Sequence, residues 1–117
     1  MKPQSSNLVY EDETLDDLII GGYKLIQPRY GYRFSIDAVL LAHFVDLKKI
    51  KQLVDLGCGN GVIPLLLAAR SGAIKVTGIE IQEAMVKRAR RSVEYNHLQE
   101  QVEIISGDLQ EIDKYLP

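Results

Sequence analysis

The sequence predicts an α/β fold in which helices flank a partial parallel β-sheet. Short apolar runs typical of buried strands alternate with helical segments over residues 53–105. A glycine-rich turn joins the first of these strands to the helix that follows it. Strands connected through helices in this order pack as a parallel sheet with right-handed crossovers. With 117 residues, 46% of them hydrophobic, the chain fits one domain with a single core.

The elements predicted before this sheet are an N-terminal extension and one helix. Residues 1–34 make up the extension. Its first half, up to residue 17, is polar and acidic. The second half combines glycine, proline and aromatic residues in a pattern that favours short strands or a hairpin. Residues 35–45 are predicted to be helical, and Ser35 or Asp37 could cap the first turn.

Three strands and two further helices are predicted after that helix. Met85, Ala89 and Val93 recur at the four-residue spacing of an amphipathic helix. Three strands form only half of a doubly wound sheet, and one edge would stay bare. We therefore expect a fragment, or a chain that a partner completes. The predicted strands cover residues 53–56, 75–81 and 102–105, and the predicted helices cover residues 62–70 and 83–96.

The stretch from Asp55 to Gly61 carries the main functional signal. Its glycines fall as G-x-G-x-G between a strand and a helix, which is the context of a nucleotide-binding loop. Glycine lets the backbone turn sharply, and free N–H groups at the helix start can face a ligand. A dinucleotide fingerprint would place a glycine at Val62, so the spacing disfavours a nucleotide-dependent oxidoreductase. Asp55 could orient the loop amides or accept a hydrogen bond from a ligand's ammonium group.

Two acidic residues follow the next two predicted strands. Glu80 closes the second strand about 20 residues after the loop, the offset at which a carboxylate meets a ribose. Asp108 follows the third strand, where it could accept from an adenine amino group while Leu109 supplies a backbone donor. Carboxyl ends of parallel strands border one crevice, so these residues would share a site. The alternatives are an exposed strand-end charge for Glu80 and a turn or helix cap for Asp108.

Together these residues resemble the class I S-adenosylmethionine-dependent methyltransferases, which have a Rossmann-like fold. Residues 55–61 match the first motif of that family, Glu80 the acid of the second and Asp108 that of the third. The resemblance implies that the loop holds the methionine part of S-adenosyl-L-methionine, Glu80 the ribose and Asp108 the adenine. The candidate cofactor-binding residues are Ser35, Asp37, Asp55, Gly57, Cys58, Gly59, Asn60, Gly61, Glu80, Ile81, Asp108 and Leu109.

The segment from Tyr30 to Ala42 is similar to the one that precedes the glycine loop in bacterial adenine-N6 tRNA methyltransferases. It also resembles the glutamine-N5 and the small-subunit rRNA guanine-N2 enzymes. The resemblance implies that this segment covers the methionine end of the cofactor, with Ser35 and Asp37 in contact. Helix capping is an equally good explanation of both residues. On this reading residues 35–117 are the N-terminal half of a cofactor-binding domain.

The acceptor side of such an enzyme is missing from the sequence. The relatives carry an Asn/Asp-Pro-Pro-Tyr/Phe motif after a fourth strand, and no such motif is present here. The catalytic residues are therefore unknown, and we expect the chain alone to be inactive in methyl transfer. The predicted function is methylation of an RNA base in tRNA or rRNA, adenine N6 first. The alternatives are a non-catalytic cofactor-binding module and a protein-glutamine N5 methyltransferase.

Composition sets the wider expectations. The net charge of −2 and the pI of about 5.6 neither indicate a nucleic-acid binder nor exclude one. One cysteine and the lack of an apolar leader favour the cytoplasm, with no membrane partner. Neither His43 nor His97 belongs to a recognisable group of metal ligands in the sequence, so no metal is expected. A basic run is interpreted as a solvated helix face rather than an RNA contact. It consists of Lys87, Arg88, Arg90 and Arg91.

Overall fold

The computed structural model describes residues 8–18, 22–31 and 36–114, with side chains from position 38 onward in the last of these ranges. A two-stranded hairpin precedes an alternation of helices and strands. The strands are β1 Glu13–Asp17, β2 Lys24–Pro28, β3 Gln52–Leu56, β4 Lys75–Glu80 and β5 Val102–Ser106. The helices are α2 Ile36–Phe44, α3 Val62–Arg70, α4 Glu83–Tyr95 and the 3-10 helix η1 Leu109–Lys114.

Strands β3, β4 and β5 form a parallel sheet in that spatial order. Its register aligns Asp55 with Gly78 and Ile104, and Glu80 with Ser106, so the carboxyl ends of the three strands meet at one edge. The predicted α/β class and parallel sheet are confirmed. The observed strands differ from the predicted ones by one residue at an end.

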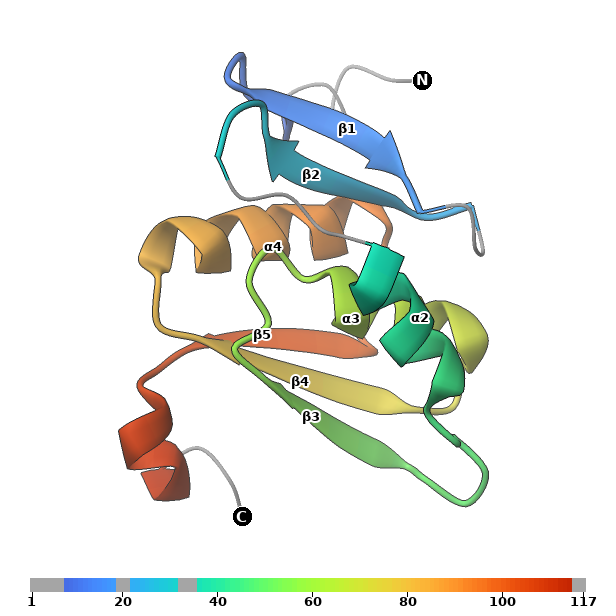
Figure 1. The fold of residues 1–117 in the computed structure, drawn as a ribbon. Coiled ribbons are helices and arrows are strands. Elements are labelled where there is room, and N and C mark those ends of the chain that lie inside the picture. The colour runs from blue at the N-terminus through green and yellow to red at the C-terminus, as the bar shows by residue number, and fades with distance from the viewer. Residues whose placement is uncertain (1–7, 19–21, 32–35, 115–117) are drawn as a thin grey trace.

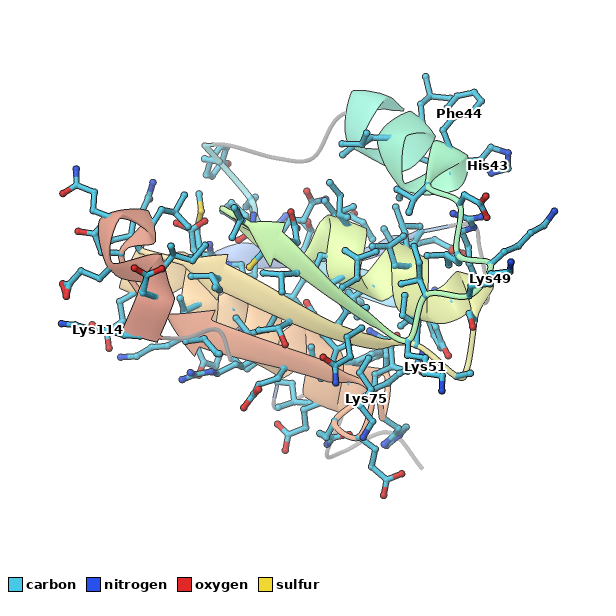
Figure 2. The ribbon with its side chains drawn as sticks, turned by 90° about the horizontal axis from the view of Figure 1, so that it is seen from below. His43, Phe44, Lys49, Lys51, Lys75 and Lys114 are labelled. Atoms are coloured by element: carbon cyan, nitrogen blue, oxygen red, sulfur yellow. The ribbon has the colours of Figure 1, made fainter. Side chains whose placement is uncertain are left out.

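Helices α2, α3 and α4 all lie on the same side of the sheet (Figure 1). Leu65, Leu66 and Val86 are fully buried there and form the core with the inward-facing residues of the strands. The opposite face, toward the viewer in Figure 2, is covered by none of these three helices. Val54 and Leu56 alternate with the inward residues of β3 and are 37% and 50% exposed.

No helix among the described residues is long and apolar enough to cross a membrane.

The antiparallel pair β1–β2 lies beyond α4, on the side away from the sheet (Figure 1). It is held to α4 by the Ile26 N–H, which donates to the Ser92 hydroxyl at 2.9 Å. The Asn96 side chain adds hydrogen bonds to both backbone groups of Lys24. A hairpin was expected only after residue 17, so the placement of its first strand was wrong. The sequence ETLDD lacks an apolar alternation, and its strand conformation depends on pairing with β2.

Candidate cofactor-binding site

The glycine loop leaves the carboxyl end of β3 and enters α3 at Gly61. Gly57, Gly59 and Gly61 have φ values of 73°, 56° and 94°, a region that glycine occupies without steric cost. Gly61 caps α3 without any side-chain hydrogen bond, so the loop starts the helix through its backbone alone. A Cβ at Gly61 would lie 3.2 Å from the Cβ of Ala89, because α4 packs directly against the loop.

Glu80, at the end of β4, holds this loop in place. Its Oε1 accepts the Gly59 N–H at 2.8 Å and its Oε2 accepts the Gln82 N–H at 2.9 Å. The residue is 7% exposed, so the alternative of an exposed strand-end charge is wrong. An ionised carboxylate has roughly four acceptor sites, and two of them are used here. Glu80 therefore keeps acceptor capacity for a ligand at the same strand end.

Cys58 lies at the bottom of the loop, packed on β4. The N–H groups of Gly57 and Cys58 both donate to the Ile79 carbonyl, at 2.7 and 3.1 Å. A Cβ at Gly78 would lie 2.8 Å from the Cys58 Sγ, so glycine is required beneath the thiol. Burial, with the nearby charges of Asp55 and Glu80, raises the pKa of the Cys58 thiol to about 12. The thiol is a packing group rather than a nucleophile.

Asp55 faces a cleft of about 110 Å³ between the loop, the start of α3 and Ala38 of α2. Burial, and after it the negative charge of Glu80, together raise the pKa of Asp55 to about 6. The N–H of Gly59 donates to Glu80, so the amide-orienting role considered for Asp55 falls in part to Glu80. A partly buried carboxylate beside a second acid favours a cationic ligand group.

Two of the predicted cofactor contacts, Ser35 and Asp37, come just before the cleft-lining Ala38 in the sequence. Ser35 and the side chain of Asp37 lie outside the described residues. Ala38 follows them directly and lines the cleft with Asp55. The helix that begins at Ile36 therefore starts next to the glycine loop.

The far side of the site is formed by residues after β4 and β5. Asp108 Oδ1 accepts the Gln110 N–H at 2.9 Å, so this carboxylate caps the first turn of η1. The capping role, an alternative from the sequence, is present, and the adenine contact stays a prediction. Ile81 and Leu109 are exposed apolar residues at neighbouring strand ends, where the Gly107 N–H also donates to the Glu80 carbonyl.

One member of the basic run on α4 reaches the glycine loop, which sequence reasoning missed. Arg88 Nη1 donates to the Asn60 Oδ1 at 3.2 Å. Its Nε donates to Glu13 in β1 at 2.8 Å. The side chains of Arg88 and Arg91 are each 15% exposed, so the solvated-face interpretation is wrong for both. The only local signal is that the two arginines, three residues apart, share one helix face.

The comparisons with known proteins match the part of the chain that contains this site. Residues 53–116 match the methyltransferase domain family. The tRNA1(Val) (adenine(37)-N6)-methyltransferase of Shewanella halifaxensis is 35% identical over 82 residues, 70% of this chain and 33% of that protein. The enzyme of the same name from Yersinia pestis is 29% identical over 90 residues, 76% of this chain and 36% of that protein. The chain thus spans about a third of these relatives.

Solved structures show the same fold. Pyrococcus horikoshii TYW2 in complex with MeSAdo aligns with a TM-score of 0.70 at 20% identity, covering 87% of this chain and 38% of that one. M. capricolum TrmK in complex with S-adenosyl-homocysteine aligns at 0.60 and 18% identity, covering 71% and 36%. The glycine loop, Glu80 and Asp108 all lie inside the matched family segment. That segment is more than half of the chain. The chain belongs to the methyltransferase domain family, in the S-adenosylmethionine-dependent class that the sequence predicted.

Proposed function

We propose that this chain binds S-adenosyl-L-methionine at the carboxyl ends of β3, β4 and β5, as the cofactor-binding part of an RNA base methyltransferase. The observation that carries the proposal is the pairing of Glu80 with the glycine loop. A buried carboxylate fixes the loop backbone while keeping acceptor sites of its own. The same strand edge holds a second acid in a small cleft.

The methionine end of the cofactor fits the loop side of this edge. Its ammonium group and its sulfonium are positive, and Asp55 and Glu80 supply negative charge. The raised pKa of Asp55 reflects the cost of ionising a buried carboxyl beside the negative charge of Glu80. A bound ammonium group would remove that cost. The positive-φ glycines leave room for a ligand to approach the loop backbone closely.

The adenosine end fits the side formed by β4 and β5. Glu80 would accept from the ribose hydroxyls with its remaining acceptor sites. Ile81 and Leu109 would flank the adenine ring with apolar surface that is otherwise exposed. Asp108 would accept from the adenine amino group through the oxygen that does not cap η1. Cys58 and Asn60 would line the loop side.

The bound cofactor supplies a methyl group activated by the positive charge on its sulfur. The residues of this chain contribute binding and orientation, which accelerate a displacement by holding the reacting groups in line. Asp55 and the loop would hold one end of the cofactor, and Glu80 and Asp108 the other. We assign none of the described residues to the acceptor.

The acceptor that we propose is an adenine N6 in tRNA. Support comes from the relatives from Shewanella halifaxensis and Yersinia pestis, both named as adenine-N6 enzymes acting on tRNA. Such a substrate would place the protein in the cytoplasm. A non-catalytic cofactor-binding module is the second candidate. Methylation of a protein glutamine is the third.

Two measurements test the proposal. Calorimetry on the 117-residue chain should show binding of S-adenosylhomocysteine in preference to NAD, and tighter NAD binding would overturn the assignment. Transfer of a labelled methyl group should be assayed on unmodified tRNA, on rRNA and on a glutamine peptide. This assay should use both the chain and the longest reading frame that contains it. Transfer to tRNA by the longer protein supports the proposal, whereas transfer only to the peptide, or none at all, selects one of the other candidates.

A further inference from the structure

A buried polar chain connects the N-terminal hairpin to the glycine loop. It runs from Glu13 in β1 through Arg88 in α4 to Asn60 in the loop, with distances of 2.8 and 3.2 Å. The Glu13 side chain is 1% exposed and the residue Asn60 is 5% exposed. Buried polar groups of this kind have fixed positions, because breaking one contact leaves the others unpaired.

Arg88 determines which way the Asn60 amide points. A guanidinium has only donors, so the Asn60 oxygen must face Arg88 and its Nδ2 must face away. Asn60 also lines the cleft that contains Asp55. The other loop anchors act on the backbone: Gly59 donates to Glu80, and Cys58 to Ile79. Arg88 is therefore the group that orients the one long polar side chain of the loop.

Glu13 in turn fixes Arg88. Its two carboxylate oxygens accept hydrogen bonds from Arg88, from both terminal nitrogens of Arg91 and from the Tyr10 N–H. Arg91 also stacks on the Tyr10 ring, with its guanidinium carbon 3.8 Å from the ring centroid. These contacts saturate the carboxylate, which would be costly to bury without them. They hold it where Arg88 can reach it and Asn60 together.

We propose that Glu13 and Arg88 are positioning residues for the cofactor site, and that the hairpin sets the orientation of Asn60 through them. The amide nitrogen thus becomes a fixed donor on the loop, suited to an anionic or carbonyl group of the ligand. This inference rests on the proposed function, because it takes the loop as the binding element. It adds that a segment outside the methyltransferase match, residues 13–28, supports the site.

The competing explanation is that the ion pairs only attach the hairpin to α4. Arg91 allows the two explanations to be distinguished. It makes two of the hydrogen bonds to Glu13 and donates to the Leu8 carbonyl, but it has no hydrogen bond to Asn60. Arg88→Met and Arg91→Met are therefore a matched pair. Both remove one guanidinium from Glu13, and only the first releases the loop side chain.

The test compares these variants by thermal unfolding, by calorimetry with S-adenosylhomocysteine and by amide hydrogen exchange. We expect Arg91→Met to lower Tm at least as much as Arg88→Met. Arg88→Met should weaken S-adenosylhomocysteine binding by about tenfold, and Arg91→Met by less than about twofold. Exchange at the amides of residues 59–61 should rise in Arg88→Met only. Equal effects of the two variants on affinity and exchange would overturn the proposal.

A double variant gives a second check. In an Asn60→Ala background, Arg88→Met should cause no further loss of affinity, because the contact it removes is already absent. Additive losses would contradict the proposal. If the unmodified chain binds no S-adenosylhomocysteine, the proposed function fails. The exchange measurement needs no ligand and would still decide the role of Arg88.

Discussion

The carboxyl group of Asp55 should make cofactor binding depend on pH. Its pKa of about 6 in the free protein should fall when an ammonium group binds beside it, so binding releases a proton near that pH. We expect S-adenosylhomocysteine affinity to be constant above pH 7 and to fall below pH 6, approaching tenfold per unit. Calorimetry from pH 5 to 8 measures this, with Asp55→Asn as the control whose affinity should be lower and independent of pH. A pH-independent wild type would show that Asp55 does not face the cation.

The same residue should reduce the stability of the free protein. A folded-state pKa raised above 3.8 stabilises the fold at low pH, and this contribution is lost as pH rises through about 6. At pH 7.5, Asp55→Asn should therefore raise Tm by a few degrees while lowering the affinity for S-adenosylhomocysteine. A residue that lowers the stability of the free protein is typical of functional sites, which agrees with the binding role proposed for Asp55.

Glu80 holds the glycine loop, and we propose that it also binds the ribose; different substitutions can separate these two roles. Glu80→Ala leaves the Gly59 and Gln82 N–H groups without their partner, so we expect a loss of about 2–3 kcal/mol in unfolding free energy. Glu80→Gln keeps the shape and one acceptor. Glu80→Gln should lower Tm less than Glu80→Ala does. It should still weaken S-adenosylhomocysteine binding by about tenfold or more, because a charged acceptor for the ribose is lost. Thermal unfolding and calorimetry on both variants measure the two effects, and a Gln variant that binds like wild type would exclude the ribose contact.

Among the elements, β4 depends most visibly on a single residue. A Cβ at Gly78 would meet the Cys58 Sγ at 2.8 Å and an Ile104 methyl at 3.0 Å. We expect Gly78→Ala to cost about 1–3 kcal/mol by overpacking. Urea unfolding of Gly78→Ala, of Cys58→Ala and of the double variant measures this cost. The double variant should recover part of the loss, since the thiol is the nearest obstacle, and strictly additive losses would contradict this packing.

The elements differ in how far the sequence predicts them. The alternation from β3 to β5 is set by local signals, namely apolar runs, the glycine turn and the spacing of Ala89 and Val93, and the prediction was accurate to one residue. β1 was missed because its acidic sequence gains its conformation from a partner strand. In the candidate site, spacing in the sequence predicted that the loop and Glu80 lie together, and the structure joins them by a hydrogen bond. The contact of Arg88 with Asn60 was not, since it joins residues 28 positions apart.

At the scale of the whole molecule, Glu13 ties the hairpin to the core and should control acid stability. Burial raises the pKa of Glu13, but hydrogen bonds from Arg91, the Tyr10 N–H and Arg88 outweigh it and lower the pKa to about 2. A lowered folded-state pKa gives stability that is complete above 4.5 and lost as pH falls toward 2. The full shift corresponds to about 3 kcal/mol. Urea unfolding between pH 7 and 2 should show this loss, and Glu13→Gln should be less stable at pH 7 with a shallower acid dependence. Parallel curves would contradict the assignment.

The single thiol of the chain, sealed between the loop and Gly78, gives the molecule an internal reporter. With a pKa of about 12 and a buried sulfur, Cys58 has almost no thiolate to offer an alkylating reagent while the loop is closed. Labelling must then proceed through rare openings, either of the loop alone or of the whole fold, and its rate measures how often they occur. Denaturant distinguishes the two kinds of opening, because only global unfolding exposes enough surface to respond steeply to urea. One natural cysteine thus makes the motion of the glycine loop measurable without a genetically introduced label.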